Sequence, residues 1–132
     1  MNKIFKSNYK VTIGDLNYGG HMGNDKALIV FQQARIDFLR AIGYDETNVE
    51  GNGLIQLESH VYYLKEVLLN ENLLCKITDI VFDRITFDII YEISNEKDEI
   101  VLKGSTKMAI FNYQKKKISR IPKEFIEKIS NL

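Results

Sequence analysis

A single helical pattern, set in a chain otherwise rich in strand-forming residues, constrains this fold more than any other feature. Between residues 24 and 42, apolar residues recur at a spacing that places them on one face of an α-helix turning ~100° per residue. That face consists of Ala27, Phe31, Ala34, Phe38, Ala41 and Ile42. Asn24 or Asp25 can cap its start, and Gly43 can end it. We therefore predict one helix about 30 Å long.

After Gly53 the sequence changes character and favours β-strands. Its segments are rich in Val, Ile, Tyr, Phe and Thr and alternate partly in polarity. They read LIQLESHVYYLKEV, NLLCKITDIVF, ITFDIIYEI, IVLKGSTKMAIFNY and KKISRI. NYKVTI, before the helix, is a further short strand, and Pro122 begins a short closing helix. The expected order is therefore a strand, the long helix, about four antiparallel strands in a meander, and a short helix.

One long apolar helix and one sheet predict an α+β fold in which an antiparallel sheet wraps around the helix. The 132 residues fit a single domain, residues 1–132. A single sheet of this size leaves an open edge and much apolar surface, and pairing of two copies would cover both. We therefore expect a homo-oligomer.

Charge and cysteine content argue against several classes of function. The 18 basic residues balance the 18 acidic ones, so nothing favours binding to nucleic acid or to an anionic membrane surface. The lone cysteine, Cys75, excludes an internal disulfide and a multi-cysteine metal site. Residues 1–10 lack the apolar core of a signal peptide, and no run approaches ~18 apolar residues. These features predict a cytosolic protein.

The stretch GDLNYGGHMGND, residues 14–25, stands directly before the helix and combines glycines with carboxylates, amides and a histidine. Its part DLNYGGHMGN resembles the N-terminal signature D-x-D/N-x-x-G-H-x-x-N of hotdog-fold acyl-CoA thioesterases, in the 4-hydroxybenzoyl-CoA thioesterase-like superfamily. The helix then supplies Gln33-Ala34-Arg35, Phe38-Leu39 and Gly43, as that family's helix does. HVYYLKEVLLNENLLCKITDI and SRIPKEF also resemble the family, so the resemblance covers nearly the whole chain.

The resemblance implies hydrolysis of a thioester to a free acid and coenzyme A, without a metal or an organic cofactor. It implies four candidate catalytic residues: Asp15, Asn17, His21 and Glu66. Many members carry an aspartate where this chain has Asn17, so the identity of the general base stays open among Glu66, Asp15 and His21. The implied partners are an acyl-CoA or acyl-carrier-protein thioester and further copies of the chain, as a homodimer or homotetramer. Lys65, Arg84 and Lys103 are possible contacts for the coenzyme A phosphates.

Thioester hydrolysis needs donors for the negative charge that develops on the carbonyl oxygen. The first N–H groups of a helix have no partner inside the helix, and the helix dipole favours an anion there. Glycine lets a ligand approach the backbone closely. We therefore assign substrate binding at the helix mouth to Gly20, Gly23 and Asn24, and expect Asn17→Ala to lower kcat more than stability.

Each candidate also has a purely structural interpretation. Asp15 and Asn17 are typical of turns, His21 can be structural, and Glu66 can be a solvated charge near a strand end. Arg35 falls within the apolar arc of the helix, either with its head in water or as a paired structural arginine. His60 is expected to be a half-buried strand residue.

Two other functions remain open from the sequence. One is a hotdog-fold dehydratase or hydratase, and the other is a protein that binds an acyl-CoA or acyl-carrier-protein without hydrolysing it.

Overall fold

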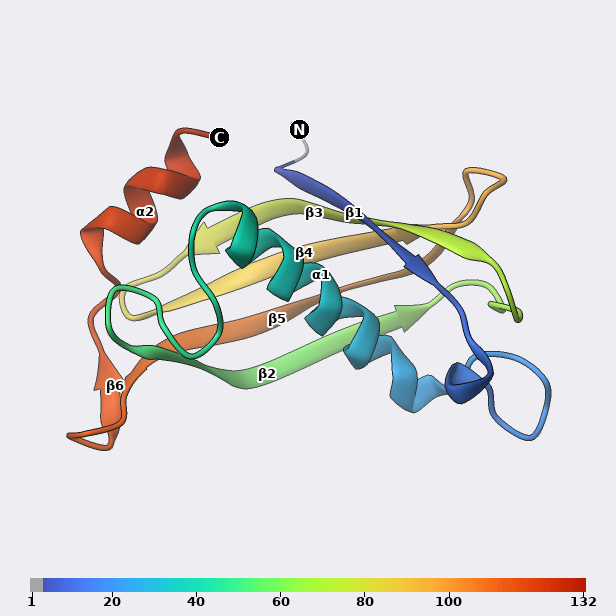
Figure 1. The fold of residues 1–132 in the computed structure, drawn as a ribbon, viewed down its shortest axis with the longest axis horizontal. Coiled ribbons are helices and arrows are strands. Elements are labelled where there is room, and N and C mark those ends of the chain that lie inside the picture. The colour runs from blue at the N-terminus through green and yellow to red at the C-terminus, as the bar shows by residue number, and fades with distance from the viewer. Residues whose placement is uncertain (1–3) are drawn as a thin grey trace.

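In the computed structural model, which describes residues 4–132, one curved antiparallel sheet wraps around one long helix (Figure 1). The strands are β1 (Phe5–Lys10), β2 (Gly53–Tyr63), β3 (Asn72–Phe82), β4 (Thr86–Ser94), β5 (Ile100–Asn112) and β6 (Lys117–Ser119). The helices are α1 (Ala27–Ala41) and α2 (Lys123–Ser130), with short 3-10 turns η1 (Ile13–Asp15) and η2 (Asn24–Lys26). The predicted α+β fold is confirmed. That residues 1–132 form one domain stays a prediction, and residues 1–3 lie outside the described chain.

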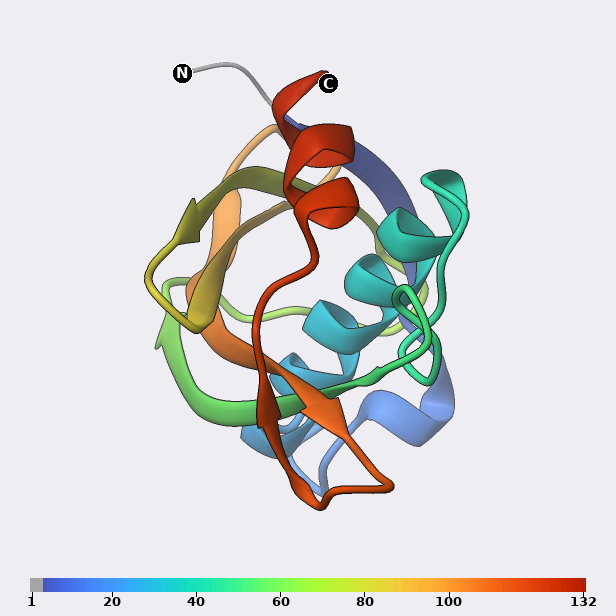
Figure 2. The ribbon, with the colours of Figure 1, turned by 90° about the vertical axis from the view of Figure 1, so that its left-hand side faces the viewer.

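The strand order in the sheet is β1-β3-β4-β5-β2, and β6 pairs with the end of β5. Strands β3, β4 and β5 form the predicted meander, but β2 lies at the edge beside β5, so the prediction is wrong for that strand. The long helix explains why β2 pairs with β5 and not with β3. Because β1 and β2 occupy opposite edges, the chain between them crosses the concave face of the sheet as α1 (Figure 2).

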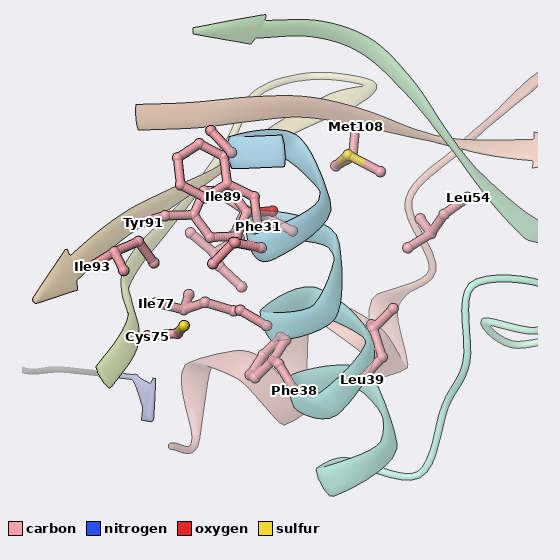
Figure 3. Close-up of a cluster of buried hydrophobic side chains, with 14 of the residues drawn as sticks. Phe31, Phe38, Leu39, Leu54, Cys75, Ile77, Ile89, Tyr91, Ile93 and Met108 are labelled. Carbon is pink, nitrogen blue, oxygen red and sulfur yellow. The ribbon is translucent and has the colours of Figure 1, made fainter. Parts of the chain in front are cut away.

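The core lies between α1 and the concave face of the sheet. The buried residues of α1 are Ala27, Val30, Phe31, Ala34, Arg35, Phe38 and Leu39. Phe31 stacks on Tyr91 of β4 with ring centroids 4.4 Å apart, and Figure 3 shows these rings among the aliphatic side chains of the sheet. Ala41, expected on the buried face, is exposed, and Ile42 is half-buried, because the helix ends there.

The predicted helix over residues 24–42 is confirmed as η2 followed by α1, but two strand ends differ from the prediction. The first strand stops at Lys10, because the following residues enter η1, where Thr12 and Asp15 form a capping box. The second strand, expected to reach Val67, ends at Tyr63. Residues 64–67 therefore leave the sheet and lie beside the start of the helix, where the candidate site forms.

Candidate functional site

The loop before the helix is held as a small hairpin that is tied to the chain after β2. Leu16 and Met22 form an antiparallel bridge, and the Asn17 N–H donates to the His21 carbonyl at 2.9 Å. The Met22 N–H donates to the Val67 carbonyl at 2.7 Å. Tyr18, at the tip, is fully exposed. Because both strands of the hairpin are bonded, the residues that follow Met22 are fixed relative to the chain after β2.

The helix mouth itself begins at Gly23, which has φ −68° and ψ 149°. Its N–H donates to the Asp15 carbonyl at 3.0 Å, and its carbonyl accepts from the Lys26 N–H at 3.0 Å. Within residues 4–132, the N–H groups of Asn24 and Asp25 donate to no protein acceptor. Two donors at the positive end of the α1 dipole are therefore free to bind an anion.

A pocket of about 260 Å³ opens beside the first of these donors, since Asn24 lines it. Its polar lining comes from His21, Asn24, Lys65 and Glu66. Its apolar lining includes Met22, Val67 and Leu102, which are all buried. The pocket thus has a polar rim at the helix mouth and an apolar floor that continues into the core.

Tyr63, the last residue of β2, also lines the pocket and connects its two walls. Its hydroxyl donates to the Asn24 carbonyl at 2.8 Å. This bond ties the end of the edge strand to the first turn of the helix. The sequence analysis missed this contact, since a tyrosine in a β-rich run carries no signal of a bond to a residue far away along the chain.

Lys65 is the one lysine or arginine among the described residues that lines the pocket, and it forms an ion pair with Glu99 in the turn between β4 and β5. Hydrogen bonds from Lys65 and Asn95 hold the pKa of the Glu99 carboxyl below its ordinary value. Both partners are partly exposed, so an incoming anion can compete with Glu99 for the Lys65 ammonium.

The pocket brings together His21, Glu66, Gly23 and Asn24 of the predicted site residues. The structure leaves the others outside its lining. Asp15 is buried, and its carboxylate accepts from the Tyr9 hydroxyl at 2.8 Å and from the Thr12 N–H at 2.8 Å.

Asn17 and Gly20 lie in the loop in front of the pocket. The Asn17 Oδ1 atom accepts the Gly19 N–H at 2.8 Å, in a turn. A Cβ atom on Gly19 would lie 3.2 Å from Asn17 Oδ1 and 3.5 Å from His21 Nε2, so both polar groups flank this glycine. Gly20 has φ +83°, which only glycine adopts readily and which closes the hairpin.

The possible phosphate contacts are spread over the molecule. Lys65 lies at the pocket, whereas Lys103 lies over the Tyr62 ring, on the outer face of the sheet. Arg84 is in the turn between β3 and β4, at the α2 end of the sheet (Figure 1). His60, expected to be half-buried, is exposed, because its position on the edge strand β2 faces the outer side of the sheet.

Arg35 is a paired structural arginine. Its Nε atom donates to Glu46 at 2.5 Å, and its Nη1 atom donates to the Tyr91 hydroxyl at 3.3 Å. Burial alone would lower the pKa of the guanidinium, but Tyr91 and Glu46 outweigh burial and raise it. The group connects α1 to the sheet and to the loop after the helix, away from the pocket.

Among residues 4–132, no three His, Cys, Asp or Glu side chains lie close enough together to hold a metal ion. In the same part of the chain, no helix is long and apolar enough to cross a membrane.

Comparisons with known protein families and solved structures give a consistent result. The model of the thioesterase-like superfamily matches residues 11–129. A 1,4-dihydroxy-2-naphthoyl-CoA thioesterase from Synechocystis has a similar structure, with a TM-score of 0.87 and 17% identity over 97% of this chain and 96% of that one. A Staphylococcus aureus protein solved in complex with CoA is also similar, with a TM-score of 0.85 and 21% identity over 99% and 85%.

A further similar structure is a gentisyl-coenzyme A thioesterase, with a TM-score of 0.84 and 14% identity over 95% of this chain and 99% of that one. No curated protein matches this chain by sequence. At these identities the structural likeness establishes the fold.

Proposed function

Because this chain belongs to the thioesterase-like superfamily, we propose that it hydrolyses an acyl-CoA thioester to a free acid and coenzyme A, in the pocket at the start of α1. The observation that carries the proposal is the conjunction of unpartnered helix N–H groups with His21 and Glu66 on one pocket. A CoA complex of a protein with this fold and the names of two other similar structures agree with it.

The carbonyl oxygen of the thioester binds at the Asn24 N–H, where the helix dipole stabilises the negative charge that develops as water attacks. Glu66 takes a proton from the attacking water, whose oxygen bonds to the carbonyl carbon. His21 lies on the same rim and donates a hydrogen bond to the intermediate or shares the work of the base. The carbon–sulfur bond then breaks, and a thiol of pKa around 8.5 leaves readily as the thiolate.

A second copy of the chain completes this proposal. Strand β2 ends the strand order, so its outer edge has no partner strand within residues 4–132. Its exposed residues include Leu57, Tyr62 and Tyr63, and Tyr63 also lines the pocket. A dimer formed along this edge would cover apolar surface and lie beside both pockets. Lys65 is then our assigned contact for a phosphate of coenzyme A.

A protein that binds an acyl-CoA without hydrolysing it is the second candidate, and one observation favours it. The carboxylate of Asp15 and the Oδ1 atom of Asn17 are both used inside the loop that they stabilise. Only His21 and Glu66 then remain at the pocket to activate water.

Thiol release from a panel of acyl-CoA substrates tests the proposal. We expect release by the unmodified chain, a loss of at least about 100-fold in kcat for Glu66→Gln, and none for the matched control Glu127→Gln, which is exposed on α2. Tight binding of intact acyl-CoA without thiol release would favour the second candidate. Loss of enoyl-CoA absorbance without thiol release would identify a dehydratase or hydratase instead.

A further inference from the structure

The floor of the pocket is made of three apolar side chains that come from separate parts of the chain. Met22 is the last residue of the hairpin, Val67 follows β2, and Leu102 lies on β5. They are 7%, 2% and 2% exposed, and all belong to the hydrophobic core. The pocket therefore ends against packed protein, without a polar side chain at its base.

The position of the floor relative to the helix mouth fixes what it can contact. Met22 is separated from Asn24 only by Gly23, and all three line the pocket. The Met22 N–H is bonded to Val67, so this part of the floor is held in place. A thioester whose carbonyl oxygen lies at the Asn24 N–H has its acyl group next to this floor.

The size of the pocket limits the acyl group. A cavity of roughly 150 Å³ in a protein core holds a benzene ring. The pocket here has about 260 Å³, and it must also hold the thioester group itself. The pocket is open on one side, so this volume indicates how much of an acyl group lies against the floor, which is about one six-membered ring or six carbons. A longer acyl chain extends beyond the pocket on its open side and gains no further contact with the floor.

We infer that Met22, with Val67 and Leu102 beside it, sets the acyl specificity of this protein and favours short or single-ring acyl groups without a charged far end. The inference rests on the proposed function. Each methylene that fits or fails to fit an apolar pocket changes specificity by roughly 10- to 200-fold, so a single floor residue is enough to decide chain length. A charged far end would lie unpaired against apolar side chains, which is unfavourable.

The chain supplies a matched control for Met22. Met108 on β5 is also buried, at 1% exposed, and belongs to the same core, but it does not line the pocket. Alanine at either position removes the same Cγ, Sδ and Cε atoms. Only Met22→Ala deepens the pocket, by room for about two or three carbons.

The test is thiol release from butanoyl-, hexanoyl-, octanoyl-, benzoyl- and palmitoyl-CoA. We expect the unmodified chain to prefer hexanoyl- or benzoyl-CoA over palmitoyl-CoA, and Met22→Ala to raise the octanoyl-to-butanoyl ratio of kcat/KM by at least about tenfold. Met22→Leu, which keeps the floor, and Met108→Ala should leave the ratio unchanged. Val67→Ala removes fewer atoms from the floor and should shift the ratio in the same direction. It therefore tests the inference if Met22→Ala does not fold.

The outcomes separate the two proposals. A palmitoyl preference in the unmodified chain, or equal ratios in the Met22 and Met108 alanine variants, overturns the specificity inference and leaves the hydrolase standing. Absence of thiol release from every substrate by the unmodified chain overturns the proposed function, and the inference with it.

Discussion

The two ends of α1 differ in how the protein treats their unpaired backbone groups. At the C-terminal end, the Tyr44 N–H donates to Leu39 at 2.8 Å and the Gly43 N–H donates to Arg40 at 3.1 Å, which is a Schellman cap with Gly43 at φ +89°. The Lys128 ammonium then donates to the Ile42 carbonyl at 3.0 Å. At the N-terminal end, the N–H groups of Asn24 and Asp25 have no acceptor within residues 4–132, and Asn24 lines the pocket.

The difference shows which end is structural and which is available for chemistry. Side chains of α2 close the C-terminal end, where Phe125 packs with its ring centroid 5.8 Å from that of Tyr44. Among the helices and strands of residues 4–132, none plays this part at the N-terminal end, where glycines and short polar residues leave the backbone accessible. Because an unpaired polar group is costly when buried, the open end is stable only where water or a ligand reaches it.

Removing the packing of α2 against the C-terminal end of α1 should therefore lower the stability of the fold without lowering the rate of hydrolysis. Phe125 is 1% exposed and contacts Tyr44, Phe82 and Phe87. We expect Phe125→Ala to lower the free energy of unfolding by about 3–5 kcal/mol, measured by denaturant titration, and Phe125→Leu to lower it much less. The kcat of the folded fraction should be unchanged. A parallel loss of kcat would mean that the two ends are coupled.

A substitution at the N-terminal end of α1 should have the opposite effect, because it should lower the rate of hydrolysis and leave the stability of the fold unchanged. His21→Ala should lower kcat/KM by about 100-fold, which corresponds to ~2.7 kcal/mol in the transition state. His60→Ala is the matched control, since His60 is exposed on the edge strand away from the pocket lining. Equal thiol release by both variants would remove His21 from the mechanism.

The lysine at the closed end should have a modest effect on stability alone. Lys128 caps the Ile42 carbonyl and lies 4.2 Å from the centroid of the Tyr44 ring. Lys128→Met keeps most of the aliphatic stem but loses the charge, so we expect about 0.5–1 kcal/mol less stability. A thermal unfolding scan with a kcat measurement checks this, and a changed kcat would contradict the division between the ends.

The smallest effect concerns the loop in front of the open end and appears only at alkaline pH. Burial and the hydrogen bond to Asp15 raise the pKa of Tyr9 from 10.0 to about 12. A raised pKa means that the folded state keeps its proton longer than the unfolded state does. The stabilisation is present below pH 10 and is lost as the pH rises towards 12. Tyr9→Phe should flatten the fall in unfolding free energy over this interval, and an unchanged slope would contradict the assignment.

The fold could be predicted well because its main signals are local or belong to a known motif. The helix over residues 24–42, the hotdog fold and the thioesterase-like family are confirmed, and the prediction of a thioester hydrolase agrees with the comparisons. The place of β2 beside β5 was missed, since strand pairing depends on a crossing of the sheet that no local pattern records.

The site could be predicted only in part. His21, Gly23, Asn24 and Glu66 meet at one pocket because three come from the motif and the family resemblance located the fourth. Tyr63, Val67 and Leu102 were missed, since apolar and aromatic strand residues look alike whether they line a pocket or fill a core. The roles of all seven predicted site residues, the cytosolic location and the oligomeric state stay predictions.

The central claim is that a free backbone N–H at the helix mouth binds the carbonyl oxygen as it becomes negative, and Asn24→Pro tests it directly. Proline removes that N–H but suits the first position of a helix, and the extended conformation of Gly23, φ −68° and ψ 149°, is the one that precedes proline. Asn24→Ala, which keeps the N–H, is the control. We predict that kcat for thiol release falls about 100- to 1,000-fold in Asn24→Pro relative to Asn24→Ala, with similar thermal unfolding. Equal kcat values in the two folded variants would contradict the account.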